Sequence, residues 1–125
     1  MNREGLAAVM EQVFEECRLL RAAGQKEYAH EDDNAFRNFE SIAADLGMRR
    51  ESVLYVYFKK HLDGIVAWIN GHRSQREEVE GRINDAIVYL CILRGMVQED
   101  KESAKRTERR GELLDVVAHR VGWEG

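Results

Sequence analysis

Apolar and polar residues recur along this chain in steps of three and four, which is the spacing of amphipathic α-helices. Four stretches carry such a stripe, and they cover residues 3–23, 35–46, 51–70 and 77–97. Glycine stands directly after each of the first three stretches, where helices commonly stop, at Gly24, Gly47 and Gly71. The pattern predicts an all-α fold whose four-helix core bundle occupies residues 1–97.

The last part of the chain follows a different pattern. From Gln98 to Glu112, acids and bases alternate and almost no apolar residue interrupts them, which is typical of a solvated helix or a flexible linker. Apolar spacing returns from Leu113 to Val121, so we expect a short amphipathic helix that docks on the bundle or on a second subunit. Residues 98–125 are therefore predicted to be a charged extension of the bundle domain.

Short polar segments join the predicted helices. Asn34 is a suitable N-cap for the second helix, and Ser74 with Glu77 spells a capping box for the fourth. The acids at 31–33 either stabilise the positive end of the second helix or belong to a loop beside a metal or phosphate. The six-residue connection at 71–76 makes the third and fourth helices an antiparallel hairpin.

Composition narrows the classes of function. The chain has 125 residues, 34% of them charged, no proline and a net charge of −4, which suits one mostly helical domain and gives no general reason to bind nucleic acid. We expect no nucleic-acid partner. The weaker alternative is a basic surface made of Arg49, Arg50, Arg73, Arg76 and the run 105–110.

The same composition suggests a compartment. Acids among the first sixteen residues exclude a secretory signal, and no apolar run reaches the roughly 20 residues of a membrane span. We therefore expect a cytoplasmic protein without a membrane partner. Cys17 and Cys91 lie in apolar stretches and are expected to be buried free thiols, with a disulfide or a metal pair as the alternative.

Charged residues interrupt the apolar hairpin at two places with the same spacing. Lys60 and Asp63 are three residues apart, as are Arg82 and Asp85, so each pair shares one helix face. If the two helices pack, two acids and two bases meet inside the bundle. The alternative is two ordinary ion pairs on helix surfaces, each contributing about 0.2–0.5 kcal/mol. His61 is the only histidine that we expect to face the same centre.

These residues resemble a family. The segment 82–90, Arg-Ile-Asn-Asp-Ala-Ile-Val-Tyr-Leu, is similar to the Glu-x-x-Asp motif of MazG-like all-α nucleoside triphosphate pyrophosphohydrolases, and Lys60-x-x-Asp63 lies where those enzymes carry Glu-x-x-Glu. A phage-associated branch of small MazG-like proteins resembles the chain more closely over residues 24–97. Its ordered features here are Tyr28, Asp32, Asp33, Asn38, Phe39, Lys60, Asp63, Glu80, Asp85 and Tyr89.

The resemblance implies a nucleotide-binding protein and a Mg²⁺-dependent pyrophosphohydrolase. Catalysis would fall to Asp63 and Asp85, and Mg²⁺ to Asp63, Asp85 and either Glu78 or Glu80. The substrate-binding residues would be Lys60, Arg82, Asn38, Tyr28 and His61. It also implies a homo-oligomer in the cytoplasm of a bacterium or of a phage-infected host.

The chain departs from the catalytic pattern in a consistent way. Lys60 and Arg82 are bases where the family carries acids, and these cations compete with Mg²⁺ for the neighbouring carboxylates or contact phosphates themselves. The second hypothesis follows from this departure. It is a helical binding or assembly module that keeps the fold, without catalysis, around a structural salt-bridge network.

Overall fold

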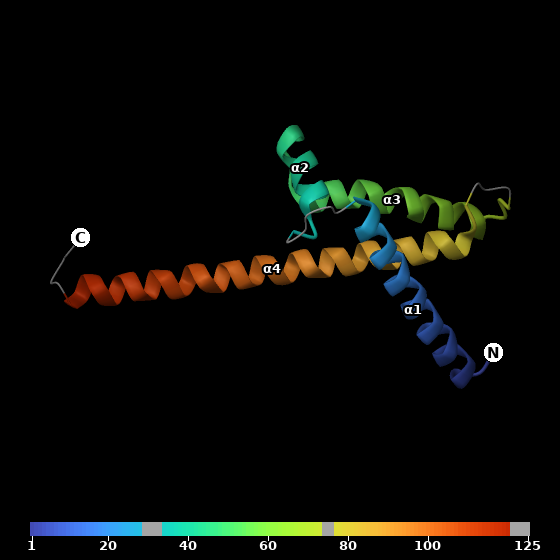
Figure 1. Cartoon of the computed structure of the whole chain (residues 1–125), viewed down its shortest axis with the longest axis horizontal. Coiled ribbons are helices and arrows are strands. Elements are labelled where there is room, and N and C mark those ends of the chain that lie inside the picture. The colour runs from blue at the N-terminus through green and yellow to red at the C-terminus, as the bar shows by residue number, and fades with distance from the viewer. Residues whose placement is uncertain (29–33, 74–76, 121–125) are drawn as a thin grey trace. The chain divides into compact units, whose positions relative to one another are not determined.

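The computed structural model describes residues 1–28, 34–73 and 77–120, with the backbone alone at 24–28. Within these residues the regular elements are four α-helices, drawn in Figure 1: α1 (Arg3–Tyr28), α2 (Arg37–Leu46), α3 (Arg50–Ile69) and α4 (Val79–Arg120). The predicted all-α class is therefore confirmed for the described part. None of these helices combines the length and the hydropathy that a membrane span requires.

Two of the predicted helix ends are confirmed, and glycine geometry explains both. Gly47 follows α2 in the left-handed conformation, with φ at 64°, and the Met48 N–H donates to the Ala43 carbonyl oxygen at 3.0 Å. Gly71 follows α3 with φ at 96°. Glycine adopts these angles without the steric cost that a Cβ imposes, so both helices end close to the predicted residues.

The start of α2 differs from the prediction by two residues. Asn34 acts in the turn before the helix, because its Oδ1 accepts the Phe36 N–H at 3.0 Å and its carbonyl accepts the Arg37 N–H at 3.4 Å. The helix itself therefore begins at Arg37. The predicted capping box cannot be followed, because Ser74 lies outside the described residues.

Two predicted boundaries are wrong. α1 continues through Gly24 to Tyr28, and α4 continues past Val97 to Arg120 without a separate C-terminal helix. An interior glycine costs only about 1 kcal/mol relative to alanine and does not force a stop. Residues 98–110 are rich in Glu, Lys and Arg, which favour helix even where no apolar stripe exists. Local contacts such as the Gln98–Glu102 hydrogen bond at 3.3 Å add to this.

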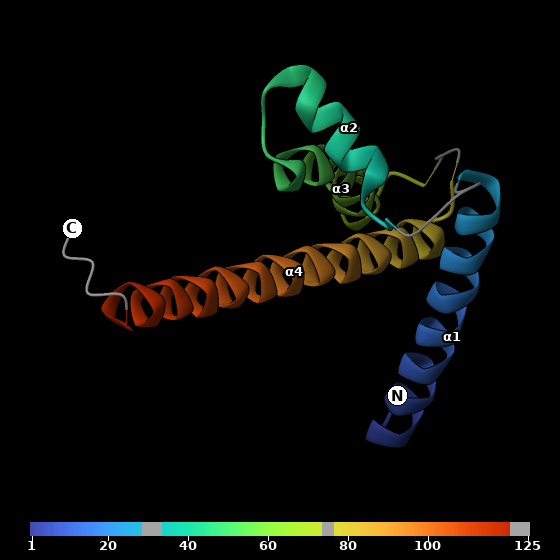
Figure 2. The same ribbon diagram turned by 60° about the vertical axis from the view of Figure 1, so that its left-hand side comes forward.

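The chain divides into two compact units, Met1–Leu93 and Arg94–Gly125. In the first unit α2 packs against α3, as Figures 1 and 2 show from two sides. Ala43, Val53 and Leu54 are buried there, and Arg50 joins the two helices by an ion pair to Glu40 at 3.3 Å. This packing anchors the first turns of α3, the helix that carries the candidate site.

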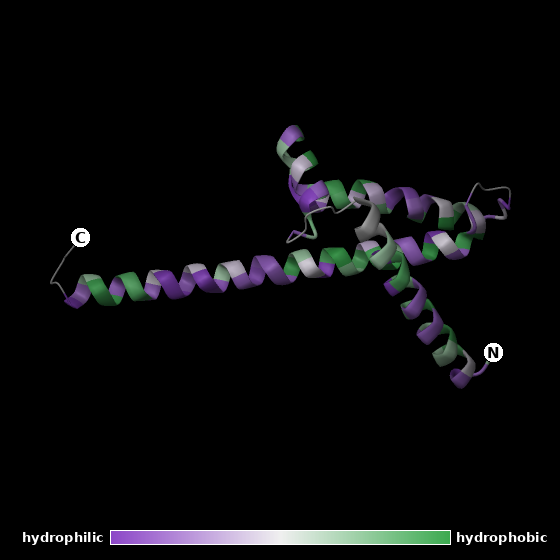
Figure 3. Cartoon of the chain, in the orientation of Figure 1, coloured by the Kyte–Doolittle hydropathy of each residue, from purple (hydrophilic) through white to green (hydrophobic). Residues whose placement is uncertain are grey.

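The first unit also links α1 to α4. The Asn84 amide donates to Glu16 at 2.8 Å, and the buried Cys17 thiol donates to the Asn84 carbonyl oxygen at 3.6 Å. The second unit is the remainder of α4, and Figure 3 shows its charged middle and its apolar last turns. Its exposed apolar side chains are Val97, Leu113, Leu114, Val116 and Val117.

Candidate functional site

The candidate site lies where α3 and α4 run side by side. His61 of α3 and Asp85 of α4 face each other, with His61 Nδ1 and Asp85 Oδ2 3.4 Å apart. Both side chains are largely buried, at 12% and 24% exposed. Glu77, which precedes α4, completes a group of three whose potential ligand atoms all lie within 4.8 Å of one another. An imidazole nitrogen and two carboxylates therefore converge on one point.

The electrostatics of Asp85 reflect this crowding. Burial raises the pKa of Asp85, and the hydrogen bond between its carboxyl group and that of Glu77 raises the pKa further. His61 and Arg82 act in the opposite direction, because their positive charge favours the carboxylate. The net effect on the pKa of Asp85 is upward, and burial is its largest cause.

Two polar atoms at this point have no hydrogen-bond partner among the described residues, although each is buried. They are His61 Nδ1 and Arg82 Nε. The His61–Asp85 separation allows an ion pair when the imidazole is protonated, but the two side chains do not form a hydrogen bond. Buried polar groups usually have a hydrogen-bond partner. A ligand or cation bound beside these two atoms would supply the partner that each lacks.

Gly64 positions Arg82. A Cβ built on Gly64 lies 2.3 Å from Arg82 Cδ, 2.5 Å from Nε and 2.6 Å from Cζ. The arginine side chain therefore crosses α3 directly over this glycine, and any larger residue displaces it. The alternative of an ordinary Arg82–Asp85 ion pair on the helix surface is not seen among the described residues, where Asp85 faces His61 instead.

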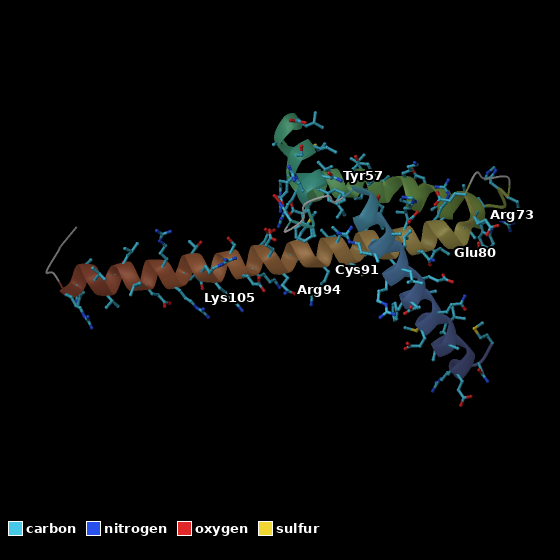
Figure 4. The ribbon with its side chains drawn as sticks, viewed as in Figure 1. Tyr57, Arg73, Glu80, Cys91, Arg94 and Lys105 are labelled. Carbon is cyan, nitrogen blue, oxygen red and sulfur yellow. The ribbon has the colours of Figure 1, made fainter. Side chains whose placement is uncertain are left out.

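An aromatic cluster adjoins His61. Tyr57 and Tyr89 have nearly parallel rings with centroids 6.4 Å apart, and Phe39 meets both edge-on. The His61 ring is 5.5 Å from that of Tyr89. Burial, followed by the charge of Asp85, raises the pKa of Tyr89, which keeps its hydroxyl protonated. Figure 4 labels Tyr57, which remains exposed, near the α2 end of α3.

Asp63 and Lys60 are predicted to lie at the centre of the bundle, but the structure places both on the surface of α3. Asp63 pairs with Lys59 on the helix surface, and its side chain is exposed. Because it follows His61 by two residues, it points to nearly the opposite side of α3. Lys60 is also exposed. Of the predicted quartet, the structure brings together Arg82 and Asp85 and leaves Asp63 and Lys60 outside.

The acids near the start of α4 differ in position. Glu78 and Glu80 are exposed, and Figure 4 shows Glu80 in the first turn of α4. Glu77 is the acid that reaches Asp85. The sequence predicts only a capping role for Glu77, in the box with Ser74 at the start of the fourth helix, whereas the structure begins α4 at Val79. The run of three acids at 77, 78 and 80 was the available signal, but the spacing alone does not choose among them.

The remaining predicted residues do not join the cluster. Asn38 is exposed on α2. Tyr28 ends α1, and its side chain lies outside the described set, as do the acids at 31–33. Of the cysteines, Cys17 is buried and free as expected, whereas Cys91 is free but exposed. The prediction of a buried Cys91 is wrong, because it lies on the side of α4 turned away from α3.

Comparison with known proteins assigns neither a family nor a function to the chain. The chain matches no protein-family model, no curated protein and no solved structure.

Proposed function

We propose that this protein binds a nucleoside triphosphate together with a divalent cation, and cleaves it to the monophosphate and pyrophosphate. The observation that carries the proposal is the convergence of His61, Glu77 and Asp85 within 4.8 Å. The MazG-like resemblance supplies the substrate class and the reaction, which consumes one water. Such a nucleotide substrate would place the protein in the cytoplasm of a bacterial or phage-infected cell.

The donor set fits a divalent cation. Two carboxylates supply the oxygen ligands that Mg²⁺ and Mn²⁺ prefer, and the imidazole nitrogen suits Mn²⁺ better than Mg²⁺. The closeness of the Glu77 and Asp85 carboxyl groups gives a second reason, since a cation relieves the repulsion between two ionised carboxylates. This set replaces the predicted one of Asp63, Asp85 and Glu78 or Glu80. When bound, the cation supplies charge that polarises the phosphate and lowers the pKa of water.

The chain's own residues support phosphate binding beside this group. Arg82 lies across Gly64, has a buried Nε without a partner, and presents a planar guanidinium that suits two phosphate oxygens. Its side chain is held by contact with α3 and needs little ordering on binding. Lys60 is exposed and long enough to add a second positive charge.

The aromatic cluster supports a nucleoside. Tyr57 is partly exposed and its ring is stacked on Tyr89, beside the imidazole of His61. Aromatic rings stack readily on nucleobases with little preference among them. In this proposal Tyr57 contacts the base, while Arg82 orients the triphosphate chain toward His61, Glu77 and Asp85.

One experiment tests cation, nucleotide and cleavage together. Purified protein is mixed with each deoxynucleoside triphosphate and Mg²⁺ or Mn²⁺, and both thermal stabilisation and pyrophosphate release are measured. Asp85→Asn should abolish both signals. Asp63→Asn is the matched control, because it removes an exposed acid of the same predicted quartet, and it should behave like the wild type. Equal losses in the two variants, or no signal in the wild type, contradict the proposal.

The binding-module hypothesis is the second candidate, and the position of Asp63 favours it. A site with two carboxylates at the centre has fewer cation ligands than the four acids of the MazG-like pattern. On this hypothesis the His61–Glu77–Asp85 group binds a nucleotide without turnover or serves as a structural network. Cation-dependent stabilisation by nucleotides, with no pyrophosphate released, identifies the binding module.

A further inference from the structure

The last turns of α4 separate their acids from their arginines. Because residues 105–120 are one continuous helix, successive side chains turn by about 100° around its axis. The acids then fall within an arc of about 60° and the arginines within another of about 100°. The acidic side consists of Glu108, Glu112 and Asp115, and the arginine side carries Arg106, Arg109, Arg110 and Arg120. Charges that alternate along the sequence are thus divided between two sides of the helix.

The apolar residues of this segment share the arginine side. Leu113 and Val117 lie one turn apart in the middle of the arginine arc, and both are exposed, at 63% and 49%. Leu114 and Val116 are exposed at the two edges of the arc; Figure 3 shows these apolar turns near the end of α4. Arginines precede and follow the apolar turn over about 21 Å of helix. The arginine side is therefore an aliphatic patch with guanidinium groups at both ends.

This arrangement does not serve the stability of the helix itself. Within the part of the chain that the structure describes, none of the four arginines forms an ion pair or a hydrogen bond. Arg106 and Arg110 are four residues apart, as are Glu108 and Glu112, and like charges at that spacing destabilise a helix. An anionic partner on the arginine side would remove the repulsion between the arginines.

We propose that the arginine side of α4 lies on an anionic phospholipid surface, with Leu113 and Val117 inserted between the headgroups. Guanidinium groups suit two phosphate oxygens each, and their long stems let them reach the phosphates while the aliphatic residues lie deeper. A phospholipid surface presents phosphate and hydrocarbon together over one plane, which matches a straight helix that carries both kinds of side chain on one side. A nucleic-acid backbone offers phosphates but no hydrocarbon for the aliphatic patch.

This contact requires no membrane span. The expectation of no membrane partner depended on the lack of a long apolar run, and a helix that lies in the surface needs only an apolar face with basic residues. The acidic side then faces water, away from the negative headgroups. No residue of the candidate site belongs to 105–120, so the proposal is independent of the nucleotide chemistry.

The first test measures how the full chain sediments with vesicles of phosphatidylcholine alone or mixed with phosphatidylglycerol. The wild type should bind only the mixed, anionic vesicles, and less as salt is added. Arg109→Glu should weaken this binding at least about tenfold, because it reverses a charge on the lipid-facing side. Lys101→Glu is the matched control, since it changes the net charge equally but lies exposed on the acidic side of the same helix. It should bind like the wild type.

The second test concerns the aliphatic patch. Leu113→Gln should weaken binding to the anionic vesicles about fivefold or more, whereas Ala104→Gln, which places the same side chain beside the acids, should not. Leucine and glutamine have similar helix propensities, and circular dichroism checks that both variants stay helical. The proposal is overturned by a wild type that ignores anionic vesicles, by equal losses in Arg109→Glu and Lys101→Glu, or by wild-type binding of Leu113→Gln. Binding to a DNA duplex without binding to vesicles assigns the arginine side to nucleic acid and overturns it too.

Discussion

At the scale of single residues, Asp85 shows which effects dominate in the candidate site. Its carboxyl group is removed from water and lies beside a second acid, and both effects favour the protonated form more strongly than His61 and Arg82 favour the charged one. A residue that stabilised the fold would be expected to show the opposite balance. Asp85 is thus held in a position that costs stability at neutral pH, which is common where function and stability compete.

Replacing Asp85 by asparagine should therefore stabilise the metal-free protein. The folded-state pKa of Asp85 is raised above its ordinary 3.8, so its contribution to stability is fully present below that pH and is lost as the pH rises through the raised pKa. At neutral pH we expect Asp85→Asn to be about 1 kcal/mol more stable, or about 4 °C in Tm. Thermal melts in chelator from pH 4 to 8 measure this; a variant that is less stable at neutral pH contradicts it.

Gly64→Ala should separate binding from stability. Alanine favours the helix, but its Cβ would lie 2.3 Å from Arg82 Cδ and force the arginine to move. We expect a stability change within about 1 kcal/mol and nucleotide binding weakened about tenfold, measured by calorimetry. Gly111→Ala is the control, because nothing lies within 4 Å of its Cβ. It should stabilise the helix and leave binding unchanged, and a Gly64→Ala variant with wild-type affinity would show that the position of Arg82 is unimportant.

At the scale of elements, a small number of polar contacts decides how α1 meets α4. Glu16 accepts hydrogen bonds from Asn84 of α4 and from Gln12 one turn earlier in α1. Both bonds lower the pKa of Glu16, and the bond from Asn84 has the larger effect. Beside these bonds, Cys17 is the buried residue of α1, and its thiol contacts the Asn84 carbonyl oxygen. The orientation of the two helices therefore depends on a carboxylate–amide bond more than on a broad apolar surface.

This link should weaken in acid. The folded-state pKa of Glu16 lies below its ordinary 4.5, so the stability it contributes is present above pH 4.5 and is lost as the pH falls through the lowered pKa. Asn84→Ala should be less stable than the wild type at pH 6, and the difference should shrink between pH 4.5 and 3. Thermal melts across this range test it, with Glu16→Gln as the variant whose pH dependence should be flattest.

The elements also show what the sequence can predict. The 3.6-residue spacing and the glycines at 47 and 71 place α2 and α3 within two residues, because each helix buries apolar residues and is followed by a glycine with positive φ. The same spacing does not reveal that α4 continues through 98–112, where the helix depends on local propensity. In the site, spacing pairs Asp85 with Arg82 but does not show that Glu77, outside the helix, folds back toward Asp85.

At the scale of the whole molecule, the two units differ in what supports them. Met1–Leu93 holds buried side chains on all four helices and polar contacts between them. In the second unit, Met96 is buried, but from Val97 to Val117 every residue is exposed. Helical stability in proteins comes mostly from packing of an apolar face. One continuous helix therefore joins a packed segment to one that depends on its own hydrogen bonds and side-chain pairs.

The two parts of α4 should consequently open at different rates. Amide hydrogen exchange of the full chain, followed by mass spectrometry, should show residues 98–117 exchanging at least about tenfold faster than residues 80–93. α3 serves as the internal reference, because its amides lie in the same packed unit as residues 80–93 and should be protected to a similar degree. Uniform protection along α4 would contradict this prediction and would show that residues 98–117 are covered in solution.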